Sequence, residues 1–277
     1  MLEIIANYFT LDWQIPILLS VVCVSLASGV LSPIVVSSRM AFFSDAVAHS
    51  TLAGVALGML LAVDHPATLM IGFGVIVALL IATLRQFTTL SFDTLLGVAM
   101  AGSLAAGVLL YHKVKGYAGL HGYLFGQVSL LTWTDFYALL FNASLAILMV
   151  LLFGNRFLLL AVSRPLAQAR GIRVARYEFL LIILLGLVVS LSVRAVGLLL
   201  VNALLIVPAA ASRNVARSVK GMFWGSVVVA LISGFVGLFG ADYFGLPPGP
   251  AIVVVAVALF LVSQVFRPLF GHHAAEA

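Results

Sequence analysis

The sequence predicts an all-α protein, a bundle of eight or nine helices that cross a membrane. Hydrophobic residues make up 64% of the 277 residues and charged residues only 8%, far below the quarter that is typical of soluble domains. The mean hydropathy is +1.24. The apolar residues fall in runs close to the ~20 residues that a helix needs to cross a bilayer, and none alternates like the strands of a membrane barrel. We therefore expect one transmembrane domain over residues 1–277.

Nine apolar runs can be drawn along the chain. They cover residues 15–36, 40–63, 67–84, 95–111, 136–153, 177–193, 196–211, 222–239 and 250–266. The seventh run is short and carries Asn202 and Pro208, so we expect a broken or tilted helix there, which leaves the number of spans at eight or nine. In the second run Gly54 and Gly58 lie four residues apart, a spacing that permits close helix packing. Before the last run, residues 247–250 are typical of a turn.

The loops between these runs differ in their content of Lys and Arg, which predicts the orientation of the chain. With the N-terminus outside, 11 basic residues fall on the inner side and 3 on the outer side. We therefore expect a multi-pass protein of the inner (plasma) membrane with a cytoplasmic C-terminus. Because the basic residues lie in short loops and not in one patch, we expect membrane lipid as a partner and no nucleic acid.

The longest polar interruption covers residues 155–176. Pro165 suits the first turn of a helix, and Gly171 suits the residue just after its end. The apolar residues that recur at helical spacing on one side are Leu166, Ala169 and Ile172. We predict a short amphipathic cytoplasmic helix near residues 163–173. It is either a solvated basic loop or a docking element for a cytoplasmic partner.

Asp45 and His49 are ionisable residues inside the second apolar run. An ionisable residue at the centre of a spanning helix costs about 2.5–3.5 kcal/mol on insertion scales, so it usually faces protein or water and has a function. Residues four apart lie one above the other on a helix, so the carboxylate and the imidazole point the same way. The pair suits a borderline divalent ion such as zinc or manganese. A proton relay and a simple packing hydrogen bond are the alternatives.

Longer motifs give this pair a context. The string from Met40 to Ser50, followed by Leu-Ala-Gly-Val-Ala-Leu-Gly at residues 52–58, resembles the signature of permeases in the ABC-type zinc/manganese/iron importer family. The likeness continues in the same order over almost the whole chain, at residues 93–97, 123–126, 166–171, 195–210 and 247–251. The resemblance implies a transmembrane permease subunit, similar to zinc importers, that moves a divalent transition metal into the cytoplasm by alternating access.

The resemblance also implies the partners and the residues of the permease. In this family two copies pair, a dimer of cytoplasmic ABC ATPase subunits docks below, and an extracytoplasmic protein delivers the metal. The chain has no G-x-x-x-x-G-K-[ST] phosphate loop, so we expect it to be no enzyme, with ATP hydrolysis in a separate subunit. The resemblance makes Asp45 and His49 the metal site. The residues that it places in the ATPase-coupling element are Arg164, Leu166, Ala167, Arg170 and Gly171.

The cargo and the mechanism keep alternatives at this stage. The metal is expected as transported cargo, Zn²⁺ more than Mn²⁺, with no permanently bound cofactor. A proton-coupled secondary metal transporter is the competing function, although no two halves with matching broken helices are evident. The chain departs from the family where acidic residues are frequent, at Ser163 and Gln127. For Asp93 we expect capping of a helix over contact with metal.

Overall fold

The computed structural model describes Tyr8 and residues 11–63, 66–113 and 128–266. These residues form helices and turns and no strand. The transmembrane helices are α2 (Ile15–Ser37), α3 (Phe43–Leu60), α4 (Pro66–Phe87), α5 (Phe92–Lys113), α7 (Trp133–Val162), α9 (Val174–Val196), α10 (Leu198–Val215), α11 (Val219–Phe244) and α12 (Pro248–Phe266). Two short helices, η1 (Val128–Leu130) and α8 (Arg164–Ala169), complete the described part. Nine of its helices are long and apolar enough to span a membrane, which confirms the predicted helical bundle.

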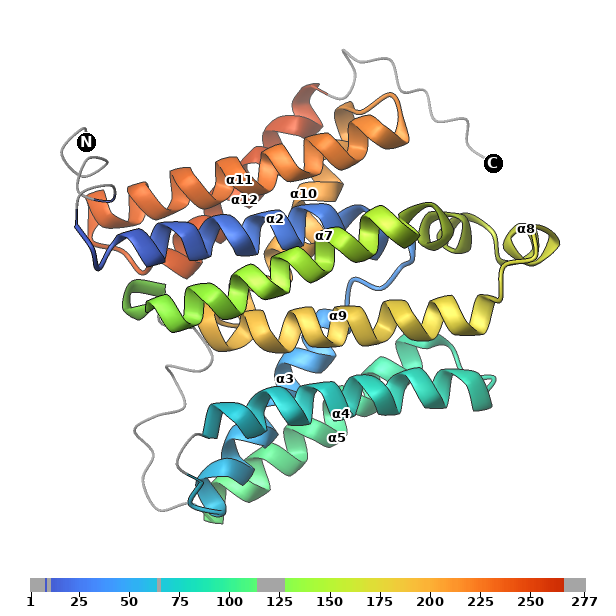
Figure 1. Ribbon diagram of the computed structural model, residues 1–277, viewed down its shortest axis with the longest axis horizontal. Helices are drawn as coiled ribbons and strands as arrows, with labels where there is room; N and C mark the ends of the chain where they lie inside the picture. The colour runs from blue at the N-terminus through green and yellow to red at the C-terminus, as the bar shows by residue number, and fades with distance from the viewer. Residues whose placement is uncertain (1–7, 9–10, 64–65, 114–127, 267–277) are drawn as a thin grey trace.

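The spanning helices form two groups joined through α3 and α9 (Figure 1). One group contains α2, α7, α10, α11 and α12, and the other contains α4 and α5. Helix α9 lies between α4 and α7 and packs against both. Helix α3 contacts α4 and α5 on one side and α9 and α10 on the other. A residue on α3 can therefore meet side chains from both groups.

Close packing around α3, α4 and α9 depends on glycines. A Cβ atom at Gly54 of α3 would lie 2.6 Å from the carbonyl oxygen of Leu69 and 2.7 Å from Cβ of Phe73, both on α4. A Cβ atom at Gly186 of α9 would collide with the Cβ atom of Ala78 on α4. Gly54 thus has the packing role that its spacing with Gly58 predicts, and it places α3 directly against the backbone of α4.

Two helices differ from the sequence prediction. Helix α7 continues to Val162, past the expected end at residue 153, because the guanidinium of Arg156 lies 5.1 Å from the ring centre of Tyr177 at the helix surface and does not break the helix. Helix α10 is continuous through Pro208, and the chain breaks instead at Gly197, whose φ of 84° suits glycine. The other boundaries agree within a few residues, and α12 begins in the predicted turn.

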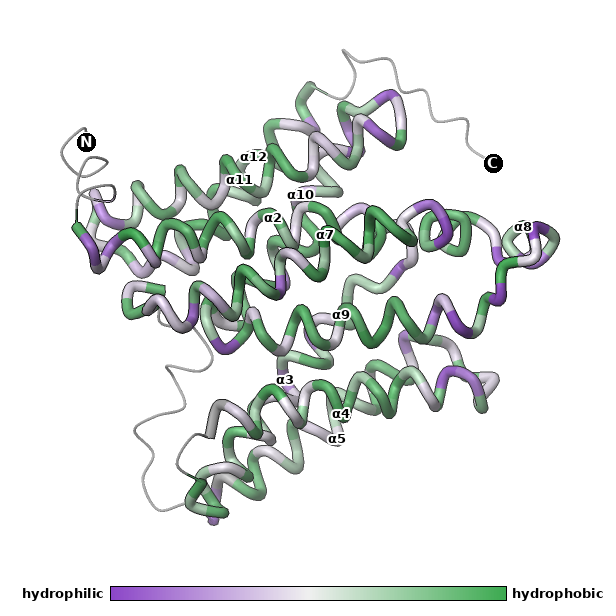
Figure 2. The backbone as a smooth tube through the Cα atoms, in the orientation of Figure 1, coloured by the Kyte–Doolittle hydropathy of each residue, from purple (hydrophilic) through white to green (hydrophobic). Residues whose placement is uncertain are grey.

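Hydrophilic residues gather at one end of the molecule, where α4 ends, α9 and α11 begin, and α8 lies (Figure 2). We call this region the basic end and define it by Arg39, Arg85 and Arg164, which line one cleft. The helix interiors between the two ends are mostly apolar. Against this background, the few polar side chains that lie inside the spanning helices are conspicuous.

Candidate metal site

The first two turns of α3 carry both predicted metal ligands. Asp45 is the third residue of this helix, and His49 follows one turn later. Ala46, Val47 and Ala48 between them are fully buried, whereas Asp45 and His49 are partly exposed. The two side chains therefore leave the helix on the same side, as their spacing predicts.

Asn202 on α10 completes this cluster. Its amide nitrogen Nδ2 donates a hydrogen bond to Oδ1 of Asp45, which joins α10 to α3 across 157 residues of sequence. From the sequence, Asn202 is expected only to disturb its helix, with no role in the site. The available signal was its position as the one polar residue between Leu198 and Val207. That signal marks a buried polar residue but does not name its partner.

Two polar atoms of the cluster have no hydrogen-bond partner. They are Nδ1 of His49 and Oδ1 of Asn202, and both are inaccessible to solvent. Buried polar atoms are usually paired, so these two atoms beside a carboxylate could bind a polar or cationic ligand. Among the described residues there is no group of three or more His, Cys, Asp and Glu side chains that could hold a metal ion. Any ion held here would need a contribution from other donors, such as water or an amide oxygen.

The predicted short helix near residues 163–173 is present as α8. Ser163 caps it, because its hydroxyl accepts a hydrogen bond from the backbone N–H of Leu166 at 3.3 Å. Gly171 follows with a φ of 73°, in the left-handed region that ends many helices. Leu166 and Ala169 of the predicted stripe are both exposed, Leu166 by 44%, and Ala167 is the buried residue of the helix. The helix ends after only six residues, so a stripe extending to Ile172 cannot form along it.

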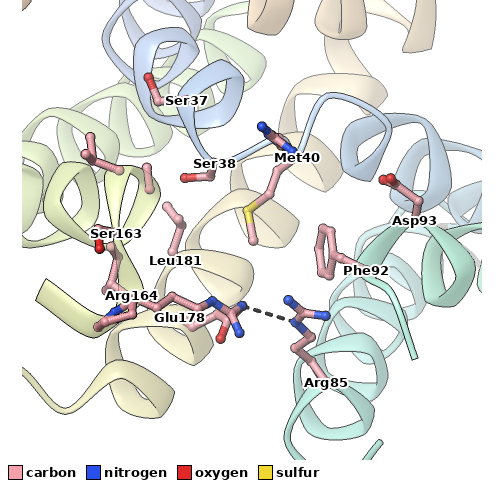
Figure 3. A pocket seen from close by; sticks show the side chains of 15 residues that line it. Ser37, Ser38, Met40, Arg85, Phe92, Asp93, Ser163, Arg164, Glu178 and Leu181 are labelled. Atoms are coloured by element: carbon pink, nitrogen blue, oxygen red, sulfur yellow. Dashed lines mark hydrogen bonds and ion pairs between the residues drawn. The ribbon is translucent and has the colours of Figure 1, made fainter. Parts of the chain in front are cut away.

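Arg164 and Arg85 meet on one carboxylate at the basic end. Oε1 of Glu178, in the second turn of α9, accepts a hydrogen bond from Nε of Arg85 at 3.2 Å and one from Nη2 of Arg164. Arg85 also donates to the carbonyl oxygen of Leu90 at 3.3 Å, and its guanidinium lies 5.3 Å from the ring centre of Phe92. We call Arg85, Arg164 and Glu178 the charge cluster. It ties the first residue of α8 to α4 and α9 (Figure 3).

The charge cluster borders an open cleft of about 540 Å³. Figure 3 shows Met40 and Phe92 across the cleft from Glu178, and Met40 lies three residues before α3 begins. Asp93 also lines the cleft, but it does not make the cap that we expected, because the hydroxyl of Ser91 accepts the hydrogen bond from the N–H of Thr94 at 3.1 Å. The predicted motif at residues 123–126 and Gln127 lie outside the described residues.

Three comparisons with known proteins agree with one another. The sequence model of the ABC 3 transport family matches residues 11–267. The high-affinity zinc uptake system membrane protein ZnuB of Haemophilus influenzae is 32% identical over 249 residues, which covers 90% of this chain and 95% of that protein. The manganese transport system membrane protein MntC of Listeria innocua is 30% identical over 257 residues, covering 92% of this chain and 90% of that one. These two relatives are named for different metals at almost equal identity.

A solved structure has the same fold over its full length. It is described as PsaBC from Streptococcus pneumoniae in complex with Fab. One of its chains superposes on ours with a TM-score of 0.82 at 28% identity. The superposition covers 98% of this chain and all of that chain. The match leaves no spanning helix of our chain without a counterpart.

Proposed function

The chain belongs to the ABC 3 transport family as a multi-pass permease subunit of an ATP-binding-cassette metal importer, and from this premise we propose how it holds and moves its cargo. Asp45 and His49 bind a divalent transition metal during its passage through the membrane. The observation that carries this proposal is the carboxylate and the imidazole on one face of α3. A nitrogen of that imidazole and the amide oxygen of Asn202 are buried and have no partner. An ionisable pair within a spanning helix is unfavourable unless it interacts with water, protein or cargo.

The site is suited to temporary binding. A closed cage of four strong ligands holds zinc as a permanent structural ion, whereas an importer must release its cargo. One carboxylate and one imidazole in each subunit bind more weakly and leave positions for water. We propose zinc as the preferred cargo and manganese as the competitor, since the mixed oxygen and nitrogen donors suit both ions.

We assign the coupling role to α8. Leu166 of this helix and Arg170 and Gly171 directly after it are exposed and available for docking, while Ala167 packs inward. Arg164 joins the helix to Glu178 of α9, so a push on α8 acts on a spanning helix through an ion pair and not only through a loop. In this proposal the basic end and the C-terminus face the cytoplasm, where a separate ATPase subunit hydrolyses ATP.

The remaining partners follow from the same assignment. A second copy of this chain forms the other half of the pathway, and an extracytoplasmic metal-binding protein delivers the ion at the end opposite to α8. Lipid surrounds the exposed apolar faces of the outer helices, for example α12, which is mostly exposed within a single copy.

The test is ATP-dependent uptake by the permease reconstituted with its ATPase and binding protein in vesicles. Zinc and manganese uptake are measured for the native chain, Asp45→Ala, His49→Ala and the control Asp135→Asn, which removes a charge near the start of α7. We expect both site variants to lose uptake and the control to keep it. Normal uptake by both site variants would remove the site assignment, and uptake driven by a proton gradient without ATP would support a secondary transporter.

A further inference from the structure

We infer that Asn202 is a third residue of the cargo site, one that orients Asp45 with its amide nitrogen and offers its amide oxygen to the cation. The inference rests on the proposed function of Asp45 and His49. It adds a residue from α10, on the other side of the junction that α3 makes between the two helix groups. It also gives the site a residue whose chemistry selects among metals.

The orientation of the Asn202 side chain follows from its partner. An ionised carboxylate can only accept hydrogen bonds, so the amide group must turn its nitrogen, and not its oxygen, toward Asp45. The amide oxygen then points away from that carboxylate oxygen. Because the hydrogen bond fixes the nitrogen, it also fixes where the oxygen lies.

The fixed oxygen is buried and unpaired. Oδ1 of Asn202 has no solvent access and no hydrogen-bond partner, and the same holds for Nδ1 of His49. A buried acceptor without a partner is unfavourable, and a bound cation would remove that free-energy cost. A divalent cation held by Asp45 would be close enough to satisfy the amide oxygen directly or through a bound water molecule.

A second asparagine inside the helix bundle shows why the group bonded to the amide nitrogen matters. Asn142 on α7 donates from Nδ2 to the carbonyl oxygen of Val188 at 3.1 Å and to the hydroxyl of Ser192 at 3.0 Å, and its Oδ1 is also unpaired. Both of these partners are uncharged groups on α9, so Asn142 joins two helices and has no bonded carboxylate to attract a cation. Asn142 is therefore the matched control for Asn202: a buried amide with a free oxygen but without a bonded acid.

The amide oxygen affects which metal the site prefers. Carboxylate, carbonyl and water oxygens suit manganese, whereas imidazole nitrogen suits zinc. Asp45 and His49 supply one donor of each kind, so a third donor shifts the balance between the two metals. As an oxygen donor, Asn202 keeps the site open to manganese, and a nitrogen donor at the same place would move the preference toward zinc.

The experiment is equilibrium binding of Mn²⁺ and Zn²⁺ to the purified full-length permease, with the visible absorption of bound Co²⁺ as a spectroscopic report of the ligand set. The variants are Asn202→Leu, Asn202→Asp, Asn202→His, Asp45→Ala and the control Asn142→Leu. Asn202→Leu removes both roles of the amide, and we expect binding to weaken by roughly 10–100-fold, as for other residues that support a metal site. Asn202→Asp retains an oxygen donor, so it should bind Mn²⁺ more tightly than Asn202→Leu does.

The metal ratio supplies the sharpest readout. We expect Asn202→His to shift the ratio of Zn²⁺ to Mn²⁺ affinity toward zinc by at least about tenfold and to change the Co²⁺ spectrum, because nitrogen replaces oxygen. Asn142→Leu should lower thermal stability and leave the ratio and the spectrum unchanged. These readouts separate a ligand from a residue that only supports the fold.

The outcomes distinguish failure of the proposed metal site from failure of the assignment of Asn202. If Asp45→Ala binds metal like the native chain, the proposed function of the site fails. If Asp45→Ala loses the metal while Asn202→Leu keeps native affinity and ratio, only the assignment of Asn202 is overturned. Should Asn202→Leu fail to fold, an unchanged ratio and an unchanged Co²⁺ spectrum in Asn202→Asp and Asn202→His overturn the assignment equally.

Discussion

Two polar regions of this membrane protein are built on opposite principles. At the basic end, Glu178 accepts hydrogen bonds from two arginines, and Arg85 has further contacts with Leu90 and Phe92. At the candidate metal site, Asp45 has one hydrogen-bond donor, while a nitrogen of His49 and an oxygen of Asn202 remain unpaired. The three charges of the charge cluster have partners within the protein, whereas two polar atoms at the candidate metal site have none.

In our proposal, this difference separates a connection between helices from a binding site. A network whose groups are all paired holds its elements in one arrangement and gains little from a ligand. A network with free buried donors and acceptors gains free energy when a ligand fills it and loses that gain when the ligand leaves. Both regions use the same few residue types, so the state of their hydrogen bonds, and not their composition, distinguishes the two roles.

The largest effect should come from removing the charge at the binding site. Asp45→Asn keeps the size of the side chain and its contact with Asn202 but removes the negative charge that attracts a cation. We expect metal uptake to fall by more than the roughly 10–100-fold that the loss of a supporting residue costs. The thermal stability should stay the same or rise, because a costly ionisable group leaves the membrane. Uptake and melting temperature measured on one preparation check this, and native uptake would contradict the comparison.

A smaller effect, on stability, is expected where α4 packs against α3 and so connects the two regions. Helix α4 carries Arg85 at its end and packs against Gly54 of α3, the helix that holds Asp45. Gly54→Val would press a side chain into the backbone of α4 and should lower the free energy of unfolding by about 1–3 kcal/mol. Denaturant titration in micelles measures the loss. The control is Gly72→Val on α4, where an added Cβ meets no atom within 4 Å.

A change in the charge cluster should reduce the coupling of ATP hydrolysis to transport more than it reduces metal binding. Glu178→Gln leaves Arg85 and Arg164 without their shared charge. We expect the free energy of unfolding to fall by about 1 kcal/mol or less, because solvent screens the half-exposed Arg164. Metal affinity should remain native, while the metal transported per ATP hydrolysed falls several-fold. Arg156→Gln, which alters another arginine at the same end, should not change that ratio. A loss of metal affinity in Glu178→Gln would erase the distinction between the two regions.

The smallest effect is expected at the opposite end of the molecule. Arg194 and Asp135 form a pair at 3.4 Å, and the Arg194 side chain is 40% exposed. An exposed pair of this kind contributes about 0–1 kcal/mol. Arg194→Gln should therefore change neither the melting temperature by more than a degree or two nor the uptake of metal. A large loss of uptake would show that ion pairs matter at both ends.

Some of this arrangement is predictable from the sequence because it depends on local patterns. Long apolar runs specify the spanning helices, and the four-residue spacing of Asp45 and His49 specifies that they share a face of α3. The helix after Ser163 is also predictable, because Pro165 and Gly171 mark its two ends.

The missed features depend on tertiary structure. The partner of Asp45 lies 157 residues away on α10, and no local pattern links the two. Glu178 shares its carboxylate with Arg85, 93 residues earlier, for the same reason. The expected end of α7 was wrong because Asn155 and Arg156 are polar residues that a helix can carry on its surface, so polarity alone does not mark a boundary.

Gly197 is the only residue between α9 and α10, so a tilt of α9 moves the start of α10. Glu178 lies near one end of this helix and Gly197 at the other, 19 residues or about 28 Å away along the axis. A tilt of about 10° at the Glu178 end would displace Gly197 by roughly 5 Å over that length. Asn202 follows only five residues later, and a hydrogen bond does not survive a displacement beyond about an ångström. If α10 follows α9 through such a tilt, the displacement exceeds what the hydrogen bond between Asn202 and Asp45 tolerates.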